Sequence, residues 1–320
     1  MAVSNQPVIE TQGLSKSYKD IQALKALNLR VGQHSIFGFL GPNGAGKTTT
    51  IKLLLGLAQP SSGAGQVFGY DIRKDSVQIR KRVGYLAQDP RYYEYLTARE
   101  ILRFTASFFF SGPKDLLEAR IEETLDLVGL DDKADRPIKG FSGGERQRVG
   151  IAQAQVNYPD LIILDEPAAS LDPQGRRDVL EVMERLRKYT TIFYSTHILD
   201  DVQRVSDTVA ILNHGELVAQ APIEQLLGGS EGVVYQLKIK GDPGQLQEQV
   251  SAQPWVTALS SNFNNGVTDW QVNVNDQDAA EDRLLRMVLA DPGVRVADFR
   301  RQSYALEDIF LKIVGETQHG

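Results

Sequence analysis

The sequence predicts an α/β fold whose main sheet is parallel, followed by a smaller α+β domain. Over roughly the first 225 residues, short apolar runs that are typical of buried strands alternate with segments of helical spacing. After a Gly-Gly-Ser stretch at residues 228–230, half-buried strand patterns and a hairpin signal replace those runs. A length of 320 residues favours about two domains, which we expect at residues 1–228 and 229–320.

Composition and charge exclude several classes of protein. The chain has no cysteine, which excludes a disulfide framework and a cysteine-ligated zinc or iron–sulfur site. A net charge of −6 argues against a protein that coats duplex nucleic acid, so no nucleic-acid partner is expected. No run approaches the roughly 20 apolar residues of a membrane span, and the first residues lack the pattern of a signal peptide. We therefore expect any membrane association to be peripheral.

Three apolar runs in the first domain predict buried strands, at residues 35–40, 161–164 and 191–194. Helical spacing predicts helices at residues 48–57 and 175–188. A longer helical pattern at residues 100–128 is interrupted by a glycine and a proline at 112–113. We expect this pattern to belong to an inserted helical subdomain at about residues 89–158.

The second domain has strand and helix signals in a different order. Strands are predicted at residues 235–240, 268–274 and 294–299, and helices at 244–252, 278–289 and 305–314. The Asn-Gly pair at residues 265–266 is a strong hairpin signal. The resulting order of strand, helix, hairpin, helix, strand and helix is close to a ferredoxin-like arrangement.

A phosphate-binding loop follows the first predicted strand. Its residues fit the phosphate-loop pattern in full: Gly41, Pro42, Asn43, Gly44, Ala45, Gly46, Lys47 and Thr48. Glycines let backbone N–H groups converge on a polyanion, and the following helix adds its dipole. We expect Lys47 to bind the β- and γ-phosphates, and the hydroxyl of Thr48 is a hard ligand for Mg²⁺.

Two further elements complete the predicted site. A buried strand ends in Asp165 and Glu166. We expect Asp165 to hold the Mg²⁺ shell, and Glu166 to orient or deprotonate the attacking water. Ser142, Gly143 and Gly144 precede a helical pattern and form a second anion-binding helix end. One nucleotide does not need two such ends from one chain. The economical explanation is that two chains meet head to tail, each lending this end to the other's nucleotide.

Over residues 7–225 these motifs closely resemble the ATP-binding cassette (ABC) family, in the family's order. The resemblance implies a P-loop NTPase cassette with a helical subdomain. It places Tyr18 on the adenine, extends the phosphate loop to Thr49, and makes Gln88 the sensor of Mg²⁺ and the attacking water. It also assigns Asp172 to the loop that couples the two sites, and His197 to the γ-phosphate. The catalytic set is then Glu166, His197 and Gln88, and the metal set is Thr48, Gln88 and Asp165.

The signature departs from the family pattern at two positions. Phe141 and Glu145 stand where leucine and glutamine are usual. The Glu145 carboxylate either weakens nucleotide sandwiching or points aside and starts the helix well, and we favour the second interpretation. After Gln88, residues 91–95 are rich in arginine and tyrosine, which are frequent in interfaces. In the family this region touches a coupling helix of the membrane partner.

The resemblance implies an ATPase that uses ATP and Mg²⁺ to drive a separate multi-span permease from the cytoplasmic face of the membrane. The expected assembly is a homodimer or a dimer with a related ATPase. Residues 304–310 look like the closing stretch of exporter ATPases of the drug, antibiotic, polysaccharide and gliding-motility group. Alternatives are an importer ATPase or a soluble ABC ATPase that acts on the ribosome or on cofactor assembly. An unrelated phosphate-loop enzyme would have no use for the signature or for His197. The second domain is open to an interface, regulatory or ligand-binding role.

Overall fold

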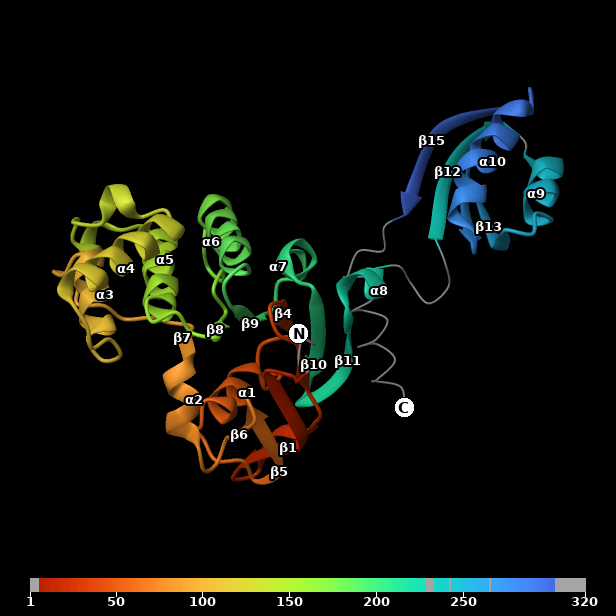
Figure 1. The fold of residues 1–320 in the computed structure, drawn as a ribbon. Helices are drawn as coiled ribbons and strands as arrows, with labels where there is room; N and C mark the ends of the chain where they lie inside the picture. The colour runs from red at the N-terminus through yellow and green to blue at the C-terminus, as the bar shows by residue number, and fades with distance from the viewer. Residues whose placement is uncertain (1–5, 228–232, 242, 265, 303–320) are drawn as a thin grey trace, which may run out of the picture. The chain divides into compact units, whose positions relative to one another are not determined.

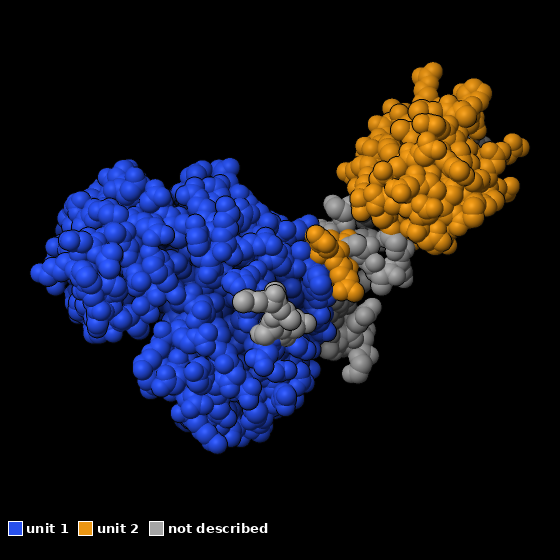
Figure 2. Space-filling view, in the orientation of Figure 1, with its two compact units in different colours: residues 1–223 blue, residues 224–320 orange. Residues whose placement is uncertain are grey.

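The computed structural model describes residues 6–227, 233–241, 243–264 and 266–302. The chain divides into two compact units, Met1–Ile223 and Glu224–Gly320 (Figure 2). The Gly-Gly-Ser stretch at 228–230, and with it the predicted boundary after residue 228, lies outside the described residues. The predicted helix at 305–314 and the tail motif at 304–310 also lie outside them.

A six-stranded sheet forms the centre of the first unit, in the order β11-β10-β4-β9-β8-β7. Its strands are β4 (Ile36–Leu40), β7 (Val83–Leu86), β8 (Leu161–Asp165), β9 (Thr191–Thr196), β10 (Thr208–Asn213) and β11 (Glu216–Pro222). All neighbours are parallel except β10 and β11. The three predicted apolar strands became β4, β8 and β9, whose residues are all buried. The predicted parallel sheet is therefore confirmed.

A second, antiparallel sheet in this unit was not anticipated. It contains β1 (Ile9–Tyr18), β2 (Ile21–Leu27), β3 (Arg30–Val31), β5 (Ser62–Val67) and β6 (Tyr70–Asp71). Register shifts interrupt the pairing of β1 with both β2 and β5, so the alternation of apolar and polar residues is broken. One apolar core joins the two sheets through α1, with Leu14, Ile51 and Phe193 among its members.

The helices of the first unit form two sets. The helices α1 (Lys47–Leu54), α2 (Ser76–Arg82), α6 (Pro173–Leu186) and α7 (Leu199–Val205) accompany the sheets, and α8 (Ile223–Leu227) begins at the end of this unit. The helical subdomain contains α3 (Ala98–Ala106), α4 (Lys114–Leu127), α5 (Gly143–Gln155) and the short 3-10 turns η1 (Asp131–Lys133) and η2 (Ile138–Gly140). Figure 1 shows α3, α4 and α5 as one group. The predicted helical pattern splits into α3 and α4 because Pro113 occupies the N-cap of α4.

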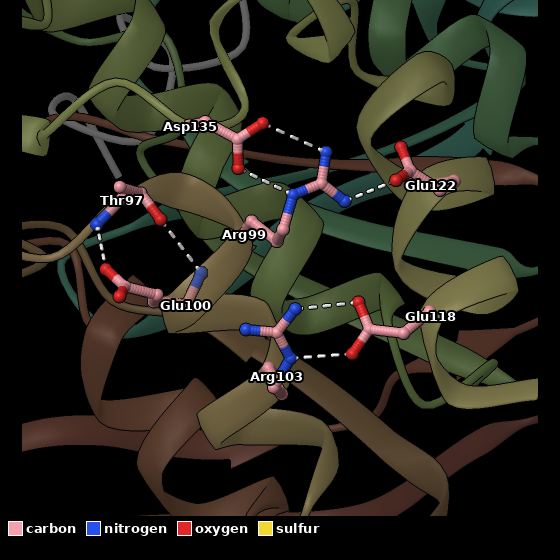
Figure 3. Close-up of polar contacts among 7 residues, drawn as sticks. All are labelled: Thr97, Arg99, Glu100, Arg103, Glu118, Glu122 and Asp135. Atoms are coloured by element: carbon pink, nitrogen blue, oxygen red, sulfur yellow. Dashed lines mark hydrogen bonds and ion pairs between the residues drawn. The ribbon is translucent and has the colours of Figure 1, made fainter. Parts of the chain in front are cut away.

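Ion pairs join the pieces of the helical subdomain (Figure 3). Arg103 on α3 forms a bidentate pair with Glu118 on α4, with N–O distances of 2.6 and 2.7 Å. Arg99 on α3 donates to Glu122 on α4 and to Asp135 in the following loop, the latter at 2.7 Å from Nε to Oδ1. Hydrogen bonds to these carboxylates raise the pKa of Arg99. These ion pairs connect α3 to α4 and to the loop that follows α4.

The second unit is a four-stranded antiparallel sheet with two helices. Its elements are β12 (Val233–Gly241), α9 (Gly244–Ser251), β13 (Val256–Asn264), β14 (Val267–Val274), α10 (Gln277–Ala290) and β15 (Val294–Gln302). The strand order β13-β14-β12-β15 and the chain order together make a ferredoxin-like arrangement. Alternate residues such as Leu237 and Trp270 pack with Leu284 of α10 in its core. No helix among the described residues of either unit is long and apolar enough to cross a membrane.

Candidate active site

The phosphate-binding loop lies between β4 and α1. Gly44 and Gly46 both have positive φ angles, +83° and +108°, which residues with a side chain rarely adopt. A Cβ atom on Gly46 would lie 2.5 Å from the carbonyl oxygen of Ala23, so the neighbouring strand also requires glycine here. Gly46 is the N-cap of α1, and no side chain among the described residues caps this helix. The first N–H groups of α1 are therefore available to an anion.

Lys47 is the first residue of α1, and its ammonium group is buried. Its side chain is only 6% exposed. The Nζ atom lies 2.6 Å from the carbonyl oxygen of Gly41, 3.2 Å from that of Pro42 and 3.1 Å from Oε1 of Glu166. Burial of a charge is costly unless it is paired and hydrogen-bonded, and these three oxygens meet that requirement.

Asp165 and Glu166 lie at the carboxyl end of β8, beside the carboxyl end of β9. The parallel register places Asp165 opposite Ser195. The Ser195 hydroxyl donates to Oδ1 of Asp165 at 2.5 Å and accepts from the backbone N–H of Glu166 at 3.0 Å. Ser195 was not among the predicted site residues. Its place at the end of a strand next to β8 is the signal that could have identified it, because parallel strands end at a common edge.

Glu166 has a strained backbone conformation, and its carboxylate lies between Lys47 and His197. Its φ angle is +53°, which is unusual for a residue with a side chain and is often found at functional sites. Its side chain is 5% exposed, and Oε2 lies 2.8 Å from Nδ1 of His197. With Lys47 on its other oxygen, the carboxylate is fixed in place at the edge of the sheet.

A polar cavity of about 300 Å³ lies over this edge. It is lined by Asn43, Gly44, Gly46, Lys47, Thr48, Thr49, Gln88 and Glu166. The structure thus brings together residues from the phosphate loop, from the segment after β7 and from the end of β8. A cavity that combines free helix N–H groups, an ammonium and a carboxylate can hold a polyphosphate next to a general base.

The oxygen donors beside the cavity suit Mg²⁺. Thr48 and Gln88 line it, and Asp165, which is 1% exposed, ends β8 immediately before the lining residue Glu166. Hydroxyl, amide and carboxylate oxygens are the hard ligands that Mg²⁺ prefers. Within the described ranges, no group of three or more His, Cys, Asp or Glu side chains could hold a metal ion. Such a donor set fits an ion that binds through one carboxylate together with substrate phosphates.

Tyr18 and Asp172 are among the predicted residues that do not line this cavity, as are Gly41, Pro42, Ala45, Asp165 and His197. Tyr18 ends β1 with 44% of its surface exposed, and Nζ of Lys16 lies 4.7 Å from its ring centre. Asp172 is the N-cap of α6 and accepts from the backbone N–H of Gly175 at 2.7 Å. Among the described residues of one chain, neither side chain forms a hydrogen bond or ion pair with the residues around Lys47.

The signature residues also lie outside the cavity, at the start of α5. Ser142 is the N-cap, and its hydroxyl accepts from the backbone N–H of Glu145 at 3.2 Å. In return, Oε2 of Glu145 accepts from the backbone N–H of Ser142 at 2.7 Å. This capping box is the geometry expected if Glu145 turns aside and starts the helix.

Comparisons with known proteins agree with this geometry. Residues 24–169 match the family described as ABC transporter. The bacitracin transport ATP-binding protein BcrA of Bacillus licheniformis is 33% identical over 322 residues, which cover 96% of this chain and 97% of that protein. The chain belongs to the ABC transporter ATP-binding family. Membership makes it an ATP-binding ATPase, as the sequence predicted.

Two further relatives of this ABC protein bear on its assembly and use. The daunorubicin/doxorubicin resistance ATP-binding protein DrrA of Streptomyces peucetius is 30% identical, over 98% of this chain and 94% of that protein. A dimeric structure of MJ0796, a bacterial ABC transporter cassette, has a TM-score of 0.61 and 25% identity, over 68% of this chain and 99% of that one. The matched part of MJ0796 is compatible with the cassette fold of the first unit.

Proposed function

We propose that this chain is the ATP-hydrolysing subunit of a membrane exporter, driving a separate permease through head-to-tail dimerisation. One observation carries the proposal. The sequence predicts two phosphate-binding helix ends, at α1 and α5, but only the α1 end lines the cavity that contains Glu166. The α5 end is therefore free to serve the nucleotide of a second copy or of a related ATPase. The dimeric arrangement of MJ0796 supports this assembly.

In the proposed dimer, ATP enters the cavity with its phosphates at the start of α1. The backbone N–H groups from Gly44 to Thr49 surround the phosphates. The ammonium group of Lys47 leaves Glu166 and binds the β- and γ-phosphate oxygens instead. Tyr18 stacks on the adenine. Ser142 of the partner subunit, with its Gly143 and Gly144, closes over the γ-phosphate. Closure excludes water and fixes the reacting groups.

Thr48, Gln88 and Asp165 would hold Mg²⁺ in this site. The ion would neutralise negative charge on the transferring phosphoryl group. Ser195 holds Asp165 by a hydrogen bond of 2.5 Å, so the carboxylate is oriented before any ligand binds.

Glu166 is the proposed general base. Once Lys47 is engaged by phosphate, the Glu166 carboxylate accepts a proton from the water that attacks the γ-phosphate in line. His197 lies 2.8 Å from Glu166, where it can orient the carboxylate and stabilise charge on the γ-phosphate. Gln88 positions the water, and Asp172 couples the site to its counterpart across the dimer. Opening after hydrolysis resets the permease, because ATP stabilises the closed state only while it is intact.

Export through a separate permease on the cytoplasmic face of the membrane is supported by relatives and by one surface. BcrA and DrrA are named for bacitracin transport and for drug resistance. In the segment after Gln88, Tyr93 is 63% and Tyr95 is 74% exposed, with ring centres 5.9 Å apart. Exposed tyrosines of this kind often anchor a protein interface. We assign residues 1–228 to ATP binding and residues 229–320 to an accessory domain.

The variant Glu166→Gln tests the shared site. Loss of the general base should lower hydrolysis by roughly 100-fold or more, while Mg·ATP binding and closure persist. We therefore expect a stable dimer in analytical ultracentrifugation with Mg·ATP, and a monomer without nucleotide. A variant that stays monomeric at saturating Mg·ATP and low salt would contradict the shared site.

The permease is tested separately, by purification of tagged Glu166→Gln chain from its own cells in mild detergent with ATP. A multi-span protein in stoichiometric amount is the expected result of mass spectrometry. Recovery with ribosomal or other cytosolic proteins alone would contradict the exporter and favour a soluble ABC ATPase.

A further inference from the structure

The start of α5 carries an ion pair that the signature motif does not explain. Nζ of Lys133 lies 2.7 Å from Oε1 of Glu145, while Oε2 of the same carboxylate accepts from the N–H of Ser142. Glu145 therefore bridges the lysine and the N-cap. Its side chain is only 13% exposed, so both of its partners act in a partly desolvated place.

The backbone around Lys133 is fixed from two sides. On one side, Nη1 of Arg148 on α5 donates to the carbonyl oxygens of Val128 and Gly129, at 3.0 and 2.7 Å. On the other side, the backbone N–H of Arg99 donates to the carbonyl oxygen of Ala134 at 3.0 Å, and its guanidinium binds Asp135 (Figure 3). Lys133 is thus presented to α5 by a rigid segment rather than by a free loop.

The pair matters because of the charge on Glu145. Burial raises the pKa of this carboxyl, but hydrogen bonds from Lys133 and Ser142 outweigh burial and leave the pKa below its ordinary value. The bond to Glu145 in turn raises the pKa of Lys133. At neutral pH both groups are charged. Without the lysine, a carboxylate that has lost its cationic partner and keeps only its bond from Ser142 would lie at the helix end that meets a phosphate in the proposed dimer.

We propose that Lys133 is a positioning residue for the shared site: it neutralises Glu145 and holds it on the N-cap, so that the Ser142 hydroxyl can donate to the γ-phosphate bound by the partner subunit. This inference rests on the proposed function, because it requires that the α5 end meets a nucleotide of a second chain. It explains how this chain tolerates a carboxylate where glutamine is usual in the family.

The test replaces Lys133 by methionine, alone and together with Glu145→Gln. Dimerisation is measured with Mg·ATP in the Glu166→Gln background, and hydrolysis is measured in the otherwise unchanged chain. For Lys133→Met we expect roughly tenfold weaker dimerisation and slower hydrolysis, because a partly buried carboxylate is left beside the phosphate without its cationic partner. ATP binding to the monomer, measured by calorimetry, should stay as it was. Adding Glu145→Gln, which removes the charge and keeps an oxygen acceptor for Ser142, should restore both dimerisation and hydrolysis.

Arg103→Met is the matched control, since it breaks an ion pair of the same subdomain that does not touch α5. Arg103→Met should leave dimerisation unchanged, even where it lowers the thermal stability as much as Lys133→Met does. The inference is overturned if Lys133→Met dimerises like the parent chain, or if Glu145→Gln fails to rescue it. If the Glu166→Gln chain with Lys133 intact does not dimerise at all, the proposed function itself has failed, and the two failures are thus distinguished.

Discussion

The starts of α1 and α5 are both predicted to bind phosphate through backbone N–H groups, but they are built in opposite ways. At α1 the N-cap is Gly46 in a left-handed conformation, and none of the described side chains caps the helix. At α5 the N-cap is Ser142, and both bonds of a capping box are present. The open end lines the cavity that contains Glu166, whereas the residues of the capped end are not among those that line it.

The two helix ends differ in which of their hydrogen-bonding groups have partners before a ligand binds. An uncapped helix end lacks partners for its first N–H groups, and a phosphate can supply them all at once. A capped end is stable without ligand, and its hydroxyl still has a hydrogen to donate after accepting from the N–H of Glu145. We infer that α1 is completed by its nucleotide, while α5 is completed in advance and waits for the nucleotide of a partner.

The largest effect is expected from Gly46→Ala, which breaks the open end. The new Cβ would lie 2.5 Å from the carbonyl oxygen of Ala23, at a φ of +108°. The loop must shift, and ATP affinity should fall by roughly 100-fold or more in calorimetry. Gly44→Ala is the control, because its φ is +83° but its Cβ would meet no described atom within 4 Å. If both variants bind ATP equally well, the close packing of Gly46 is not what shapes the loop.

A smaller effect is expected from Ser142→Ala, which breaks the capped end. Loss of the N-cap should cost about 1 kcal/mol of unfolding free energy. It should also weaken Mg·ATP-dependent dimerisation by roughly tenfold, with ATP affinity of the monomer unchanged. Thr97→Ala removes the same kind of capping box from α3 and serves as the control. A Thr97→Ala chain that dimerises as poorly as Ser142→Ala would show that subdomain stability, rather than the hydroxyl, is responsible.

The smallest effect concerns acid, which protonates the carboxylates that pair with arginine in the helical subdomain. Hydrogen bonds from arginine hold the pKa values of Glu118 and Asp135 below their ordinary values of 4.5 and 3.8. Since the folded pKa values are lowered, these pairs stabilise the fold above the ordinary values, and this contribution is lost as pH falls through the lowered values. The unfolding midpoint should therefore drop modestly in strong acid. The unfolding midpoint of Arg103→Met should drop less than that of the parent chain between neutral pH and that acid range. An equal drop would remove Glu118 from this role.

Much of the α1 region was predictable because its signals are local. The apolar runs of β4, β8 and β9 are continuous, and the phosphate loop is one uninterrupted motif. Glu166 was predicted from its place at the end of β8, and the structure puts it against Lys47. The antiparallel sheet was missed because register shifts in β1 interrupt its periodicity.

Neighbouring residues along the chain were enough to predict the family, the two-part organisation of strand and helix signals, and the motifs expected to bind phosphate. Only the tertiary structure decided how Ser195 supports Asp165 and how Lys133 meets Glu145. These pairs are 30 and 12 positions apart. They meet through strand register and through the packing of α3, α5 and the segment between them. Such contacts depend on where distant segments dock, and no local propensity encodes that docking.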